Sequence, residues 1–133
     1  MPPWAEVYWM GKQVVKSPVD MWTYQEIIFE TRPDLIVETG TSGGGSAWFF
    51  ASVFNSMRRF GEIITVDKDF YPDLCLPHPR IQYLTGDSTS EEIATRIRAA
   101  CAGRRTMVSL DSLHTYEHVS KELALYGELV SPG

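Results

Sequence analysis

Basic residues, cysteines and long apolar runs are all scarce in this sequence. Lys and Arg number 12 against 17 Asp and Glu, and the resulting formal charge of −5 argues against a nucleic-acid substrate. The apolar run at 47–53 is far shorter than the roughly 20 residues that span a membrane, and no basic and apolar leader opens the chain. The two cysteines, Cys75 and Cys101, lack metal-ligand spacing. We therefore expect a cytoplasmic protein that binds neither nucleic acid nor membrane.

Apolar residues are abundant enough for one packed core. They make up 44% of the 133 residues, and aromatic residues make up 12%, so the sequence predicts a single domain over 1–133. Residues 1–18 carry Trp4, Tyr8 and Trp9 among prolines without a sustained period. This pattern predicts an irregular arm packed by aromatic side chains.

Short apolar runs alternate with helical patterns along the rest of the chain. Strands are predicted at 35–39, 63–66, 81–84 and 107–110, and helices at 18–31, 46–57, 90–102 and 115–130. Parallel strands need crossover connections, so this order predicts an α/β fold with an open parallel sheet of about four strands and helices on both faces. Such Rossmann-like sheets bind ligands at the carboxyl ends of their strands.

A glycine-rich segment, ETGTSGGGS at 38–46, joins a predicted buried strand to a predicted helix. A dinucleotide fingerprint needs glycines at i, i+2 and i+5, and Ser42 or Trp48 stands in a required place. A phosphate-binding P-loop needs a lysine where this chain has Ser46. The remaining pattern, an acid at the entry of a loop without lysine, suits a ligand with a ribose and a cationic amino-acid part, such as S-adenosylmethionine (SAM).

The residues of this loop resemble the SAM-binding loop of catechol-type O-methyltransferases. The pattern E-x-G-x-x-x-G-x-S is met by Glu38, Gly40, Gly44 and Ser46. Over the whole chain the sequence resembles the cephalosporin hydroxylase and rhamnosyl O-methyltransferase family. The motifs that carry this resemblance are PVD at 18–20, YQE at 24–26, RPD at 32–34, VETGTSGGGSA at 37–47, GDS at 86–88 and LDSLHTYEHV at 110–119. The resemblance implies a class I methyltransferase fold that stops after its fourth strand–helix unit.

The same resemblance implies a set of cofactor-binding residues at the strand ends. They are Glu38, Gly40, Thr41, Ser42, Gly44, Ser46, Asp67, Lys68, Gly86, Asp87, Ser88 and Asp111. Glu38 would hold the ammonium of SAM directly or through water, and Asp67 would accept both ribose hydroxyls. Asp87 and Ser88 would face the adenine. The alternative for each acid is a helix cap or a solvated loop carboxylate.

Candidates for catalysis follow the last predicted strand. Asp111 and His114 are the predicted catalytic residues, and the resemblance implies that Asp111 is also one ligand of a magnesium site. Leu113 replaces the second acid of the family's D-S-D-H pattern, which weakens the case for magnesium. His114 is alternatively a helix cap. The string from His114 to His118 also matches the zinc pattern H-x-x-E-H, which we interpret as coincidence.

The predicted strand at 107–110 would form an uncovered apolar edge, because the strands that follow in the implied fold are missing. We therefore expect a homodimer or another partner chain. The aromatics Trp4, Tyr8, Trp9 and Trp22 either roof an acceptor pocket or belong to the core. Three functions stay open: O-methylation of a small hydroxylated acceptor such as a phenol or sugar, with S-adenosylhomocysteine (SAH) as product; SAM binding without turnover by a split module; and SAM breakdown.

Overall fold

The apolar runs form one parallel sheet in the computed structural model, which describes residues 3–132. Its strands are β3 (Leu35–Thr39), β4 (Glu62–Asp67), β5 (Ile81–Thr85) and β6 (Thr106–Leu110), and their spatial order is β5-β4-β3-β6. The central strand β3 is buried along its whole length, as a strand covered on both faces requires. The predicted α/β class and four-stranded parallel sheet are confirmed.

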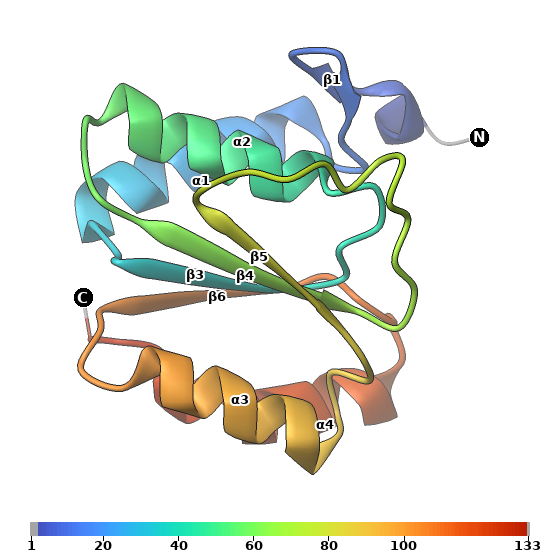
Figure 1. The fold of residues 1–133 in the computed structure, drawn as a ribbon, viewed down its shortest axis with the longest axis vertical. Helices are drawn as coiled ribbons and strands as arrows, with labels where there is room; N and C mark the ends of the chain where they lie inside the picture. Colours follow the sequence, from blue (N-terminus) through green and yellow to red (C-terminus); the bar gives the residue numbers. More distant parts are fainter. Residues whose placement is uncertain (1–2, 133) are drawn as a thin grey trace.

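Helices cover both faces of this sheet, as predicted (Figure 1). The first two, α1 (Pro18–Thr31) and α2 (Gly45–Ser56), lie on one face, and α3 (Glu91–Cys101) and α4 (Tyr116–Tyr126) lie on the other. On the first face, buried side chains of α1 and α2 pack on β3 and β4, and on the second face Ile97 and Tyr126 pack on the same strands. The last helix is shorter than predicted, because a 3-10 turn at Gly127–Leu129 follows it.

The N-terminal arm is more regular than the sequence suggested. After a 3-10 turn at Pro3–Glu6, strands β1 (Tyr8–Trp9) and β2 (Lys12–Gln13) form an antiparallel hairpin. Its two-residue loop holds Met10 at φ 50° and Gly11 at φ 80°, the positive angles that favour the twist of a tight hairpin. The prediction of an irregular arm is wrong at Tyr8–Gln13.

Strand β6 lies at one edge of the sheet and pairs with β3. Its apolar residues Met107, Val108 and Leu110 are half-buried. The predicted exposed edge is therefore present within residues 3–132. No helix of this part of the chain has the length and apolar character needed to cross a membrane.

Candidate functional site

A cleft of about 520 Å³ opens at the carboxyl ends of the four strands. This volume falls within the roughly 300–1,000 Å³ typical of small-molecule sites. Most of the predicted site residues line it: Gly40, Thr41, Ser42, Ser46, Asp67, Lys68, Gly86, Ser88, Asp111 and His114. Of the others, Gly44 and Glu38 are buried beside the cleft, and Asp87 is half-buried next to Ser88.

Gly40 sets the shape of the loop that leaves β3. Its φ is +90°, and its N–H donates a hydrogen bond of 2.8 Å to the carbonyl oxygen of Val66 on β4. A Cβ at this position would lie 2.0 Å from the carbonyl oxygen of Asp111 at the end of β6. Only glycine fits, because three strand ends converge on this residue.

Glu38 lies beneath the loop. Its side chain is fully buried, and its two carboxylate oxygens accept hydrogen bonds from the hydroxyls of Ser46 and Thr65. Burial raises the pKa of Glu38 to about 6. This geometry does not present the carboxylate to the cleft, so a direct contact between Glu38 and a ligand ammonium would require the loop to move. Glu38 remains a predicted cofactor-binding residue that would act from below the loop.

Asp67 ends β4 and faces the same loop from the other side. Its Oδ2 accepts a hydrogen bond of 2.9 Å from the backbone N–H of Ser42, and its Oδ1 accepts one of 3.3 Å from the backbone N–H of Asp69. Ser42 itself has a positive φ of 48°, so the loop turns sharply at the residue that donates this bond. Two carboxylate oxygens at the rim of a cleft are suited to a pair of neighbouring hydroxyls.

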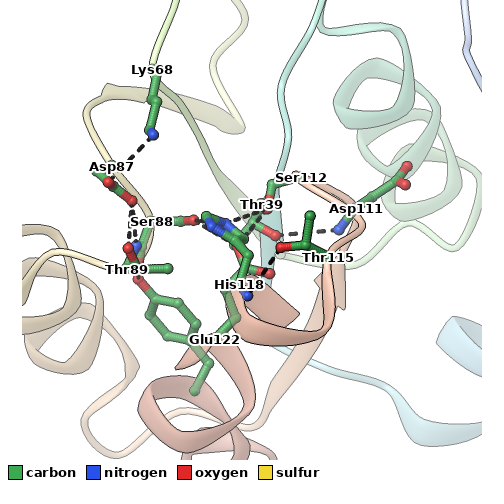
Figure 2. Close-up of polar contacts among 11 residues, drawn as sticks. Thr39, Lys68, Asp87, Ser88, Thr89, Asp111, Ser112, Thr115, His118 and Glu122 are labelled. Atoms are coloured by element: carbon green, nitrogen blue, oxygen red, sulfur yellow. Dashed lines mark hydrogen bonds and ion pairs between the residues drawn. The ribbon is translucent and has the colours of Figure 1, made fainter. Parts of the chain in front are cut away.

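Asp87 is held by its own turn at the mouth of the cleft. Its Oδ1 accepts hydrogen bonds from the hydroxyl and the N–H of Thr89, at 2.7 and 2.9 Å, and these bonds lower the pKa of Asp87. The ammonium of Lys68 lies 3.4 Å from Oδ2, and Figure 2 shows this pair bridging two strand ends. Ser90, not Asp87, caps α3, so the geometry of Asp87 fits the alternative of a loop carboxylate that stabilises its own turn.

Asp111 forms an ion pair that the sequence did not predict. Its Oδ2 contacts the ammonium of Lys16, and the side chain of Lys16 is only 8% exposed. Burial by itself would lower the pKa of Lys16, but the charges of Glu38 and Asp111 outweigh burial and raise it. Lys16 is therefore an ammonium at neutral pH. His114 lies 3.3 Å from the other oxygen, Oδ1, with a side chain that is 73% exposed.

Ser88 belongs to a second group of polar side chains in the cleft, whose association through Glu122 the sequence analysis did not predict (Figure 2). Glu122, which is 1% exposed, accepts hydrogen bonds of 2.6 Å from the hydroxyls of Ser88 and Ser112. His118 Nε2 lies 3.0 Å from Ser112 Oγ and 3.2 Å from Glu122 Oε1. This cluster fixes two serines that line the cleft. Helical i, i+4 spacing of His118 and Glu122 was the available signal.

Comparison with known proteins identifies the family of this chain. Residues 3–133 match the protein-family model described as Rhamnosyl O-methyltransferase/CmcI. The chain belongs to this family. Rhamnosyl O-methyltransferases of Mycobacterium leprae (strain TN) and Mycobacterium bovis (strain BCG / Pasteur 1173P2) are 36% and 33% identical to it over 135 residues. These alignments cover 98% of this chain but 58% and 55% of the relatives, so the chain spans little more than half of their length.

Solved structures share the fold of the Rhamnosyl O-methyltransferase/CmcI family at lower identity. A structure described as "cmcI-D160 Mg-SAM" superimposes with a TM-score of 0.75 and 20% identity over 97% of this chain and 55% of its own. The MycE methyltransferase of mycinamycin biosynthesis, in complex with Mg and SAH, superimposes with a TM-score of 0.66 and 23% identity over 87% of this chain and 31% of its own. These likenesses support the Rossmann-like methyltransferase fold.

Magnesium in those structures raises the question of whether the residues here fit a metal. Asp111 is engaged by Lys16 on Oδ2, and Leu113 is exposed where the family pattern has an acid. Nowhere in residues 3–132 do three or more His, Cys, Asp or Glu side chains gather, as they do in metal sites whose ligands all come from the protein. His114 also precedes α4, so it does not share a helical face with His118. Within the described residues, Asp111 is therefore the one predicted magnesium ligand, and its Oδ2 is already paired with Lys16. The placement of His114 does not fit the zinc pattern.

Proposed function

We propose that the cleft binds SAM and that the chain takes part in the methylation of a hydroxyl group on a small acceptor. The observation that carries the proposal is the placement of Asp67 opposite the Gly40–Ser46 loop, in a cleft lined by all four strand ends. Family membership supports the same conclusion, because the curated relatives are named as O-methyltransferases.

Different residues of the chain would bind different parts of SAM. The backbone of the loop after β3 would lie under the methionine part, and Asp67 would accept the ribose hydroxyls in place of the Ser42 N–H. Ser88, which Glu122 holds in place, would lie beside the adenine. A positioned arrangement of this kind suits an in-line displacement, in which orientation supplies much of the rate enhancement.

SAM would supply the methyl group of its sulfonium. A hydroxyl that receives this group loses its proton, and Asp111 is the residue best placed to accept it, with Lys16 and His114 on its two oxygens. His114 remains a predicted catalytic residue, although its high exposure in this structure favours exchange of the proton with solvent.

A second candidate is a module that binds SAM without turnover and needs a partner chain. Two observations favour it: no cluster of three or more potential metal ligands lies within residues 3–132, and β6 is an edge strand of the sheet that these residues form. A second copy or another chain that pairs with β6 would cover Met107, Val108 and Leu110.

One assay separates these functions. The purified chain is incubated with SAM labelled with ¹³C on its methyl group, with catechol or a methyl glycoside as acceptor, in EDTA or in magnesium. A labelled ether product supports the methyltransferase. Consumption of SAM in the absence of an acceptor indicates SAM breakdown. Binding of SAH without a methylated product indicates the SAM-binding module without turnover. A folded chain that binds neither SAM nor SAH contradicts the proposal.

A further inference from the structure

A second cleft of about 800 Å³ adjoins the cofactor cleft. It lies between the N-terminal arm, the first part of α1 and the end of β6. From the sequence alone, Trp4 was one of four aromatic residues that either roof an acceptor pocket or belong to the core, and it lines this second cleft. The structure shows a cleft formed by residues of this chain.

The two clefts meet at a common wall. Trp4, Val15, Lys16 and Asp111 line both. The Lys16–Asp111 pair, in which the Asp111 side chain is 31% exposed, therefore borders the cofactor cleft and the second cleft. A methyl transfer needs a cofactor and an acceptor on opposite sides of one reacting point, and this wall is the place in the chain where two clefts approach one another.

Side chains of α1 give the second cleft a mixed character. Its polar wall is formed by Ser17, Asp20, Thr23 and Tyr24, whose hydroxyl is hydrogen-bonded to Ser109 at 3.0 Å, and its apolar wall includes Ile27 and Leu110. The charged residues that line this cleft are one basic residue, Lys16, and two acidic residues, Asp20 and Asp111. Such a surface suits an uncharged ligand that has hydroxyl groups on one side and an apolar face on the other.

We propose that this second cleft is the acceptor site and that the Lys16–Asp111 pair receives the acceptor hydroxyl. The assignment rests on the proposed methyl transfer and names the substrate side of it. As the oxygen–carbon bond forms, the carbon–sulfur bond breaks with its electron pair on sulfur, and the hydroxyl proton passes to Asp111 and then to solvent. The sulfonium becomes a neutral thioether, so charge and protons balance.

Lys16 is the positioning residue of this arrangement. Its ammonium contacts Asp111 and lies 5.7 Å from the centre of the Tyr24 ring. It holds the carboxylate toward the common wall, and Figure 2 shows the Asp111 side chain directed away from His118 and its neighbours. A fixed ammonium there also stabilises negative charge that develops on the acceptor oxygen.

The test blocks the second cleft and leaves the first intact. Thr23 and Ile27 line the second cleft and not the cofactor cleft, so Thr23→Trp and, independently, Ile27→Trp fill it from α1. Glu30→Trp adds the same ring to an exposed position of that helix outside both clefts. Saturation-transfer NMR measures binding of catechol and of a methyl glycoside to the SAH-loaded chain, and calorimetry measures SAH affinity.

We expect at least one probe to bind the SAH-loaded wild type and to bind at least tenfold more weakly in both blocking variants. Glu30→Trp should match the wild type, and SAH affinity should stay within twofold throughout. Catechol binding indicates a phenolic acceptor, and glycoside binding indicates a sugar. Binding of neither probe, or binding that persists in both blocked variants, overturns the acceptor site while the cofactor site stands. Failure of SAH to bind the folded wild type overturns the proposed function itself.

Discussion

Replacing Gly40 by alanine tests whether the convergence of strand ends shapes the site. Gly40 has φ +90°, and an added Cβ would lie 2.0 Å from the carbonyl oxygen of Asp111. Real Cβ atoms essentially never come closer than 3.0 Å to such a neighbour, so β3 and β6 would have to separate by at least about 1 Å at their ends. Gly103 provides the matched control, because it has φ +72° and open space around its Cβ position.

The two substitutions share one energetic penalty and differ in the other. A left-handed backbone costs a residue with a Cβ about 1–2 kcal/mol, and forced overpacking adds about 1–3 kcal/mol. Gly103→Ala should therefore lower the free energy of unfolding by about 1–2 kcal/mol, and Gly40→Ala by about 2–5 kcal/mol. The displaced loop in Gly40→Ala should also weaken SAH binding more than tenfold.

Urea unfolding gives the stability difference, and calorimetry with SAH gives the affinity. SAH affinity should be unchanged in Gly103→Ala, because Gly103 precedes β6, at the end of the strand opposite the cleft, and does not line the cleft. Equal destabilisation by the two variants, or wild-type SAH affinity in Gly40→Ala, would refute the argument that the close approach to Asp111 fixes the loop.

Two further substitutions test the buried polar groups around the site. The pKa of Glu38 is about 6 in the folded chain and near 4.5 in the unfolded chain, so the folded chain binds this proton more tightly. The free energy of unfolding therefore falls as pH rises from 4.5 through about 6. Between pH 4 and pH 7 the wild type should thus lose about 2 kcal/mol relative to Glu38→Gln in urea titrations, and parallel pH profiles would contradict this. Tyr126→Phe removes a buried hydrogen bond to the carbonyl of Ser88 and should cost about 1–2 kcal/mol. The control Tyr116→Phe, at an 84% exposed side chain, should stay within about 0.5 kcal/mol of wild type, and equal losses in the two variants would show that the buried bond contributes nothing.

The sequence predicted the sheet well because each strand is a short, mainly apolar segment that lies between helical patterns or loops. The segment Leu35–Thr39 is buried on both faces. A short segment of this kind between a helix and a glycine loop is too short for a helix, so a buried strand is the favoured prediction. The arm was harder to predict because its hairpin turns at Met10–Gly11. Methionine is not among the residues usual at the first position of such a turn, so the local signal was weak.

The loop and Asp67 were predictable because each lies at the end of a strand, and parallel strands bring those ends together. Lys16 was not predictable in the same way. It comes from the segment between hairpin and first helix and meets Asp111 at a sequence separation of 95 residues. No local pattern encodes that contact. His118 was considered in the sequence only as part of a zinc pattern, and the packing of α4 beside Ser88 and Ser112 gives it a different role.

Calorimetric titration of the purified chain with SAH, repeated on Asp67→Ala and Asp69→Ala, tests the central claim that this cleft is a SAM site. Asp67 lines the cleft, whereas its neighbour Asp69 is exposed outside it. The account predicts micromolar binding at one site per chain. Asp67→Ala removes the hydrogen bonds from the ribose hydroxyls, each worth about 1.5–3 kcal/mol, and should weaken SAH binding at least tenfold. Asp69→Ala should bind SAH with wild-type affinity. Absence of binding in a well-folded wild type, or equal affinity in the two variants, would contradict it.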